Sequence, residues 1–144
     1  MVKRLLVERI LIGIETDLAA LRRADDITWP VYQQDVRARR FVERTLHVLI
    51  EACIDIAQHI IADQRLREPE SYRDTFAVLV EAGILPETDR YRFEQMAAFR
   101  NLLVHYYEKI DDQTVYGIFR NHLADFSFFA DRIRAYLDSA GGGP

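Results

Sequence analysis

The chain has 144 residues, of which 49% are hydrophobic and 29% are charged, a composition typical of globular proteins. With only 6 Gly and 4 Pro, it is neither collagen-like nor a low-complexity linker. Its 19 basic and 23 acidic residues give a net charge of −4, which argues against a protein that coats nucleic acid through a basic surface. All basic residues except Lys3 and Lys109 are arginine, so a local site could still bind phosphate through planar guanidinium groups.

Helical periodicity dominates the sequence, and no stretch alternates with a period of two for more than a few residues. Apolar residues at three- and four-residue steps predict a first amphipathic helix over residues 2–23. The segment that ends in Trp29 and Pro30 interrupts this pattern. A long second helix is predicted over residues 32–62.

Capping and turn residues place three further helices. Ser71, with Asp74 three residues later, resembles an N-cap box, and Gly83 occupies the position of a C-terminal glycine, which predicts a short third helix between them. A fourth helix is predicted over residues 90–107, and Asp111 and its neighbour can cap a fifth. The fifth helix has the clearest apolar stripe, formed by Val115, Ile118, Phe119, His122, Leu123, Phe126, Phe129, Ile133, Tyr136 and Leu137.

These elements predict an all-α fold, an up-and-down bundle of about five helices. We expect residues 1–139 to form a single domain, and residues 140–144 a flexible tail. The one cysteine, Cys53, excludes an internal disulfide and a cysteine-based zinc site, and it suits a reducing cytoplasm. Charged residues interrupt the apolar N-terminal stretch and the apolar run over residues 46–62. We therefore expect a cytoplasmic protein with neither a secretory signal nor a membrane-spanning helix.

The fourth helix carries a charge where its spacing requires an apolar side chain. Arg100 lies in the stripe formed by Phe93, Met96, Ala97, Leu103 and Val104. An unpaired buried charge costs several kcal/mol, so Arg100 must pair with a neighbouring helix, extend to solvent or face an anionic ligand. If Arg100 forms a structural ion pair, its replacement by alanine should cost ~3–5 kcal/mol of stability.

Two further strips flank this position on the same helix. Phe99, Leu102 and Tyr106 form a second apolar side, which predicts that one side packs in the bundle and the other in a subunit interface. Asn101 and His105 are one turn apart, so Asn101 can orient the imidazole for proton transfer. A single helical histidine is nevertheless more often structural than catalytic.

The second helix offers a rival site made of carboxylates and imidazoles. The residues, at four-residue steps, are Glu43, His47, Glu51, Asp55 and His59. Such side chains can bind Zn, Mn or Fe, but helical drift spreads these five over ~160°, and the Glu-x-x-His pairs of ferritin-like sites are absent. We therefore favour a solvated or interface stripe and expect no metal and no other cofactor.

A basic cluster precedes this stripe. It consists of Arg37, Arg39, Arg40 and Arg44. Such a cluster is usually a solvated face, and it is also a candidate rim for RNA or for a protein partner.

Residues 99–107, Phe-Arg-Asn-Leu-Leu-Val-His-Tyr-Tyr, resemble the Arg-x4-His-x-Tyr motif of the HEPN superfamily, in the form carried by HepT-like toxins of prokaryotic toxin–antitoxin pairs. The likeness continues, in order, through residues 42–44, 50–61, 69–72 and 115–118. It therefore spans nearly the whole chain.

This resemblance implies a homodimeric helical bundle that acts as a metal-independent endoribonuclease, the toxin of a type VII-like toxin–antitoxin module. In this scheme Arg100 binds the scissile phosphate, His105 is the general base or acid at the attacking 2′-hydroxyl, and Asn101 orients His105. The need for a 2′-hydroxyl restricts cleavage to RNA. The partner is a minimal nucleotidyltransferase antitoxin, which silences the toxin by attaching AMP to Tyr107. The alternative is a non-catalytic HEPN module that binds a nucleotide or a partner protein.

Ideal helix geometry agrees with part of this scheme. Arg100 and Tyr107 lie ~20° apart around the helix axis, so AMP on Tyr107 can reach Arg100. Arg100 and His105 lie ~140° apart, so their side chains converge poorly within one subunit unless the helix loosens near Tyr106 or the second subunit completes the site. We favour completion of the site by the second subunit of a dimer.

Overall fold

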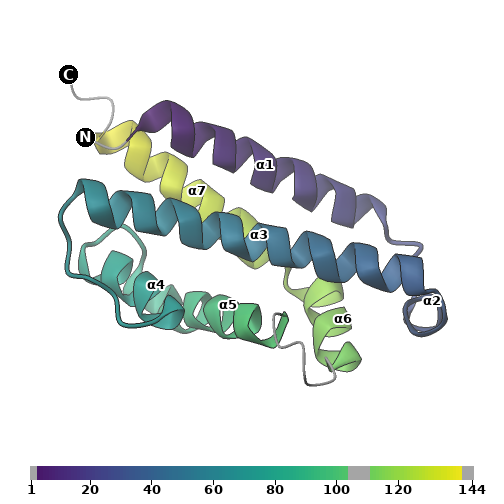
Figure 1. Ribbon diagram of the computed structural model, residues 1–144. Helices are drawn as coiled ribbons and strands as arrows, with labels where there is room; N and C mark the ends of the chain where they lie inside the picture. Colours follow the sequence, from purple (N-terminus) through teal and green to yellow (C-terminus); the bar gives the residue numbers. More distant parts are fainter. Residues whose placement is uncertain (1–2, 104–110, 141–144) are drawn as a thin grey trace.

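Figure 1 shows a computed structural model of the chain, in which residues 3–103 and 111–140 are described. Every regular element in these two ranges is helical, as the sequence predicts. The elements are α1 (Arg4–Arg23), α2 (Trp29–Gln34), α3 (Val36–Asp63), α4 (Tyr72–Glu81), the short 3₁₀ helix η1 (Glu87–Asp89), α5 (Arg90–Leu103), α6 (Asp112–Asn121) and α7 (Leu123–Ala140).

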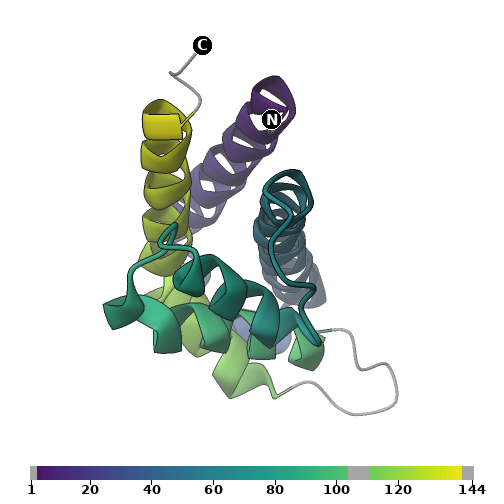
Figure 2. The same ribbon diagram turned by 90° about the vertical axis from the view of Figure 1, so that its left-hand side faces the viewer.

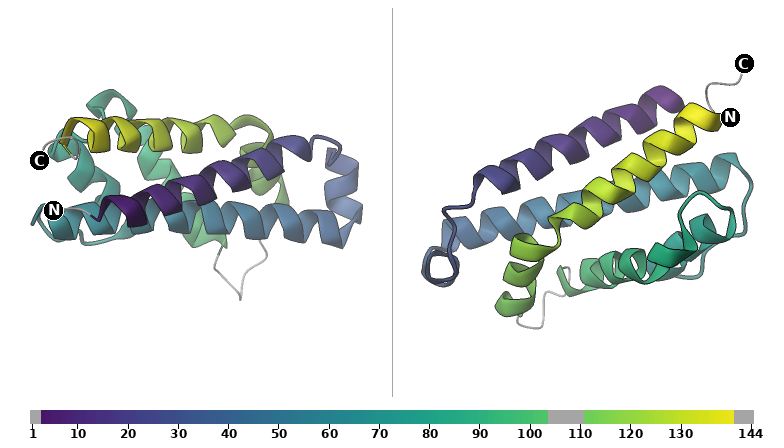
Figure 3. Two further views of the ribbon diagram at one scale, coloured as in Figure 1. Left: turned by 90° about the horizontal axis from the view of Figure 1, so that it is seen from above. Right: turned by 180° about the vertical axis from the view of Figure 1, so that it is seen from behind.

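The long helix α3 is the centre of the bundle, and each of the other six α-helices packs against it. Helices α1 and α7 run along one side of α3, and α4 and α5 lie on the other side (Figures 1 and 2). Seen from behind, α7 crosses the molecule between α1 and α5 (Figure 3). The buried side chains of these helices form one continuous hydrophobic cluster.

The core follows from the amphipathic patterns. In α1 the buried positions recur at three- and four-residue steps, so one face of the helix is removed from water; they are Val7, Leu11, Ile14, Leu18 and Leu21. Three phenylalanines connect α4, α5 and α7: the ring centre of Phe76 lies 6.3 Å from that of Phe93 and 5.7 Å from that of Phe129. Burying such aromatic side chains contributes much of the stability of a small core.

The predicted boundaries of α4 are confirmed. The hydroxyl of Ser71 accepts a hydrogen bond from the backbone N–H of Asp74 at 3.0 Å, which satisfies one of the free N–H groups of the first turn. At the other end Gly83 has φ +79°, and its N–H donates to the carbonyl of Val80. The N–H of Ile84 donates to the carbonyl of Leu79, which completes a Schellman motif.

Two predicted helices are each divided in two. The predicted second helix is interrupted at Asp35, which has an extended backbone and accepts hydrogen bonds from the N–H groups of Arg37 and Ala38. Asp35 thereby caps α3 and separates it from α2. The predicted fifth helix is interrupted at His122 (φ −125°, ψ 14°), which separates α6 from α7. His122 was placed in the apolar stripe, but its side chain is 60% exposed.

By length and composition α3 could span a membrane, but this is weak evidence, because the core helix of a soluble protein passes the same test. Half of its most apolar window is buried inside the bundle.

Cys53, on α3, is fully buried, and burial raises the pKa of its thiol. At the other end of the chain Ala140 ends α7, and residues 141–144 of the predicted tail lie outside the described ranges.

Candidate active site

Arg100 is in the last turn of α5 that the structure describes, and it faces α3 and α4. Its Nε donates a hydrogen bond to Oε1 of Glu51 on α3 at 2.7 Å. The Arg100 side chain is 22% exposed and that of Glu51 is 41% exposed, so this ion pair lies at the edge of the core and remains in contact with solvent. A charge in this stripe needs a partner, an exit to solvent or an anionic ligand, and in the structure Glu51 is the partner.

The guanidinium of Arg100 also lies over an aromatic ring. The central carbon of the Arg100 guanidinium lies 4.3 Å from the ring centre of Tyr72, within the range of a cation–π contact. Tyr72 is the first residue of α4, directly after the capping residue Ser71. Glu51 and Tyr72 also line a groove of about 440 Å³ that extends over α3 as far as Ile10 of α1.

A guanidinium has five N–H donors, and Glu51 uses the one on Nε. Within residues 3–103 and 111–140, the remaining four N–H groups of Arg100, on Nη1 and Nη2, have no hydrogen-bond acceptor. These two nitrogens form the planar fork that binds a phosphate through two parallel hydrogen bonds. No residue in the described ranges therefore occupies the phosphate-binding edge of Arg100.

The remaining motif residues are described only in part. Asn101 follows Arg100 on α5, and its side chain is exposed. His105 and Tyr107, as well as the predicted continuation of the fourth helix to residue 107, lie outside the described residues.

The carboxylate and imidazole stripe on α3 separates into pairs one turn apart. Nε2 of His47 lies 3.4 Å from Oε1 of Glu51, the oxygen that also accepts from Arg100, and Nε2 of His59 lies 3.5 Å from Oδ1 of Asp55. Burial raises the pKa of the fifth member, Glu43. Among the described residues no group of three or more His, Cys, Asp or Glu side chains is placed to hold a metal ion.

The basic cluster upstream contains one residue with a structural role. Nη1 of Arg39 donates to the carbonyls of Tyr32 and Gln33, both at 3.0 Å, and so satisfies carbonyl groups at the end of α2. The other three arginines of the cluster are exposed; they are Arg37, Arg40 and Arg44. A binding rim in this part of the protein would therefore consist of these three exposed side chains.

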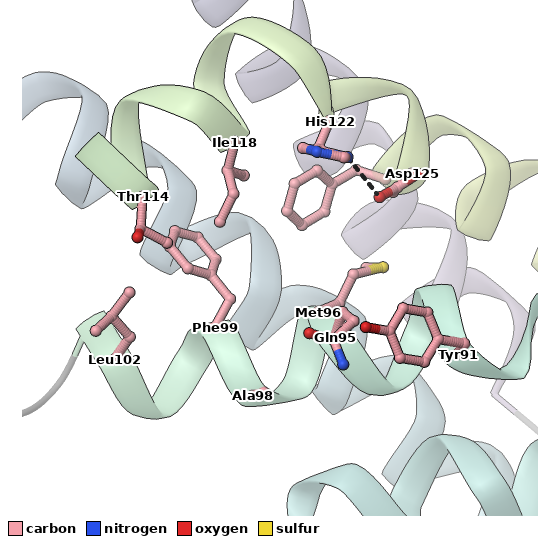
Figure 4. Close-up of a pocket in the computed structure, with 11 residues that line it drawn as sticks. Tyr91, Gln95, Met96, Ala98, Phe99, Leu102, Thr114, Ile118, His122 and Asp125 are labelled. Atoms are coloured by element: carbon pink, nitrogen blue, oxygen red, sulfur yellow. Dashed lines mark ion pairs between the residues drawn. The ribbon is translucent and has the colours of Figure 1, made fainter. Parts of the chain in front are cut away.

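The second apolar side of α5 faces its own chain. Phe99 is only 6% exposed, because it packs toward α6 and α7, so at this residue the second apolar side packs within the bundle. Figure 4 shows that Phe99 and the half-buried Leu102 line a largely apolar pocket of about 470 Å³ between α5 and α6, with His122 and Asp125 at its edge. Burial raises the pKa of Asp125, although neighbouring positive charges oppose this shift. Arg100 is not in the lining of this pocket.

Comparison with known proteins identifies the family. A family model described as "Ribonuclease HepT-like" matches residues 14–133, which include Glu51, Tyr72 and Arg100. The chain belongs to the HepT-like ribonuclease family. The resemblance inferred from the Arg-x4-His-x-Tyr motif is thereby confirmed.

Relatives of known description agree with this assignment. The mRNA nuclease HepT of Shewanella oneidensis is 35% identical over 104 residues, which cover 72% of this chain and 78% of the relative. The structure of a tri-AMPylated Shewanella oneidensis HEPN toxin in complex with MNT antitoxin superposes with a TM-score of 0.80 at 29% identity, covering 90% of this chain and 96% of that one. YutE of Bacillus subtilis, described as a cytosolic protein of unknown function, gives a TM-score of 0.83 at 29% identity, covering 99% and 95%.

Two residues of this HepT-like site, Glu51 and Tyr72, were not predicted from the sequence. Glu51 was one of five candidates in the stripe on α3, and nothing in the spacing singled it out as the partner of Arg100. Tyr72 appeared only as part of a resemblance to the family. The available signal was its position directly after a helix-capping serine, which fixes the start of α4 and hence the direction in which the side chain of residue 72 leaves the helix.

Proposed function

We propose that this HepT-like chain is the toxin of a type VII-like toxin–antitoxin module and that it acts as a metal-independent endoribonuclease. The observation that carries the proposal is Arg100, whose guanidinium is held by Glu51 and Tyr72 while its Nη1 and Nη2 groups stay uncommitted within the described residues. Membership of the family and the complete sequence motif support it. An RNA phosphodiester is the anion that such a site would bind.

The proposed reaction uses the 2′-hydroxyl of the RNA as nucleophile. His105 accepts the proton of this hydroxyl, the 2′-oxygen forms a bond to phosphorus, and the bond from phosphorus to the 5′-oxygen breaks. A proton from the general acid neutralises the leaving 5′-oxygen, so the products are a 2′,3′-cyclic phosphate and a 5′-hydroxyl. Arg100 binds the phosphate and offsets the charge that develops on it, and Asn101 orients the imidazole of His105.

The proposed active form is a homodimer. On an ideal helix Arg100 and His105 point ~140° apart, so one subunit alone places them poorly for a single phosphate. A second copy of the motif would let Arg100 of one subunit act with His105 of the other. The exposed arginines Arg37, Arg40 and Arg44 are candidates for contacts with RNA or antitoxin.

The proposed regulation is covalent. The Shewanella relative is described as tri-AMPylated and in complex with MNT antitoxin. We assign the corresponding modification here to Tyr107, carried out by a cognate nucleotidyltransferase antitoxin. On an ideal helix Tyr107 would lie two turns after Arg100, and an AMP group there would place negative charge and bulk where the RNA phosphate must bind. We place the protein in the cytoplasm, where the YutE relative is described to be.

One observation favours the alternative, a non-catalytic HEPN module. Arg100 already has a carboxylate partner, Glu51, and an ion pair of this kind needs no ligand. In that case Arg100 would support the fold or bind a nucleotide without cleaving RNA.

A cleavage assay separates the two functions. The unmodified protein is incubated with a mixed RNA pool in EDTA, after intact mass has confirmed that Tyr107 carries no nucleotide. We expect cleavage by the wild type and none by His105→Ala. His122→Ala is the matched control, because His122 is an exposed helix-flanking histidine whose removal should leave cleavage unchanged. If neither the wild type nor the control variant cleaves while the protein remains dimeric, the binding module is the correct function.

A further inference from the structure

Arg100 is held by two contacts. Glu51 accepts a hydrogen bond from Nε at 2.7 Å, and the central carbon of the guanidinium lies over the ring of Tyr72, 4.3 Å from the ring centre. The hydrogen bond by itself leaves the guanidinium free to rotate about the line from Nε to Oε1. The contact with the ring restricts this rotation, because a cation–π contact favours a guanidinium placed over the face of the ring. The two contacts together restrict both the position and the rotation of the group.

The ring itself has a firm support. The hydroxyl of Ser71 caps the first turn of α4, and the carboxylate of Asp74 accepts hydrogen bonds from Nη1 and Nη2 of Arg67 at 2.7 and 2.8 Å. The same carboxylate accepts from the backbone N–H of Glu70 at 2.9 Å. The backbone on both sides of Tyr72 is therefore fixed, and an aromatic side chain has only two rotatable bonds to order.

We propose that Tyr72 is a positioning residue for RNA cleavage: its ring restricts the rotation of the Arg100 guanidinium, so that Nη1 and Nη2 meet the scissile phosphate as a preformed fork. This inference rests on the proposed function. Arginine has a long side chain, and ordering it only when RNA binds would cost conformational entropy in every catalytic cycle. Glu51 and Tyr72 supply that order before RNA arrives, and Tyr72 does so without occupying any N–H group of the fork.

Two substitutions at position 72 isolate the role of the ring. Tyr72→Phe keeps the aromatic face and removes the hydroxyl, and Tyr72→Leu removes the face. With enzyme in excess over RNA, we expect Tyr72→Leu to cleave ~10-fold more slowly, since a tenfold effect corresponds to about 1.4 kcal/mol and a partly desolvated cation–π contact is of this size. Tyr72→Phe should restore most of the rate. If Tyr72→Leu does not fold, as judged from its thermal melt, Tyr72→Met takes its place.

The matched control is Phe128→Leu. Phe128 also supports guanidinium groups, those of Arg92 and Arg132, each 4.8 Å from its ring centre. Its replacement removes cation–π contacts on α7 that do not involve Arg100, so it should change the melting temperature without lowering the cleavage rate.

Binding of RNA that carries 2′-O-methyl groups, which cannot be cleaved through the 2′-oxygen, tests whether Tyr72 acts through Arg100. We expect Tyr72→Leu alone to weaken binding of this RNA relative to the wild type. Added to Arg100→Ala, the same substitution should weaken binding no further. An equal loss in both backgrounds would mean that Tyr72 contacts RNA directly, and the inference would be wrong. It is also wrong if Tyr72→Leu cleaves at the wild-type rate, or if Tyr72→Phe is as slow as Tyr72→Leu. A wild type that binds this RNA but cleaves no RNA contradicts the proposed ribonuclease function, and the binding comparison then still decides the relation between Tyr72 and Arg100.

Discussion

Arg100→Ala separates a structural from a catalytic role of the residue on which the proposed function depends. A fully buried ion pair loses ~3–5 kcal/mol when one partner is removed, because the other charge remains in a dry environment. The pair between Arg100 and Glu51 is different, because the two side chains are 22% and 41% exposed. After the substitution Glu51 can be hydrated, and His47 remains 3.4 Å from its Oε1. The stranded carboxylate therefore costs little.

The expected loss of stability follows from the two contacts of the guanidinium. An ion pair near the surface contributes ~0–1 kcal/mol, and a partly exposed cation–π contact contributes ~0.5–1 kcal/mol. We therefore expect Arg100→Ala to lower the free energy of unfolding by ~1–2 kcal/mol, which for a chain of this size lowers the melting temperature by ~2–8 °C. Loss of a preorganised donor to a developing oxyanion should reduce the cleavage rate by ~100- to 1000-fold.

The assay measures thermal unfolding and RNA cleavage on the same preparation, with Arg92→Ala as the matched control. Arg92 lies on the same helix, pairs with Asp125 at 3.3 Å and rests on the ring of Phe128 at 4.8 Å. Its replacement should therefore cost a similar amount of stability and leave cleavage unchanged. Loss of more than ~4 kcal/mol in Arg100→Ala would refute the reasoning from exposure. Equal cleavage by the two variants would refute the catalytic role of Arg100.

Two predictions concern the two ends of α4. Hydrogen bonds from Arg67 and the Glu70 backbone hold the pKa of Asp74 at about 2, below the ~3.9 of an aspartate in an unfolded chain. The ionised Asp74 carboxylate therefore stabilises the fold fully above about pH 4, and this stabilisation is lost as the pH falls toward 2. In urea unfolding, Asp74→Asn should be less stable than the wild type at pH 7 and should lose less stability between pH 4 and pH 2; parallel pH profiles would contradict this. Gly83→Ala should lower the free energy of unfolding by ~1 kcal/mol, because the φ angle of +79° disfavours any residue with a Cβ. The cost is not steric, since an added Cβ meets no atom within 4 Å. An unchanged melting temperature would exclude backbone strain at this turn.

Sequence patterns predicted the features that depend on residues close together in the chain. Ser71 and Gly83 set the ends of α4 through contacts within three to five residues, and both were found from sequence. The break at His122 was missed because the apolar stripe continues through it: Phe119 before the break and Phe126 after it are both buried. A stripe reports which side chains avoid water, and it does not reveal that the helix axis changes direction between them. Asp35 carried a usable signal, since an aspartate before a helical pattern is a strong N-cap.

The sequence predicted that Arg100 needs a partner but could not identify that partner. Glu51 is 49 residues away, and its contact with Arg100 depends on how α3 and α5 pack, which periodicity does not determine. Five polar residues at four-residue steps on α3 were equivalent in the sequence, and tertiary packing selects one of them. Tyr72 depends in addition on the position of α4, the third helix at the site.

The alternatives that the sequence posed for Arg100, an ion pair or an anion-binding site, are compatible in one structure. Among the described residues, Glu51 engages one of five N–H donors and the ring of Tyr72 lies beneath the central carbon, so none of them occupies the Nη edge that a phosphate would bind. A carboxylate that took both Nη groups would compete with RNA for the same donors. A carboxylate on Nε holds the guanidinium in place and leaves the fork for the substrate. For this reason an ion pair at Arg100 supports a phosphate-binding role, provided that its geometry is the one observed.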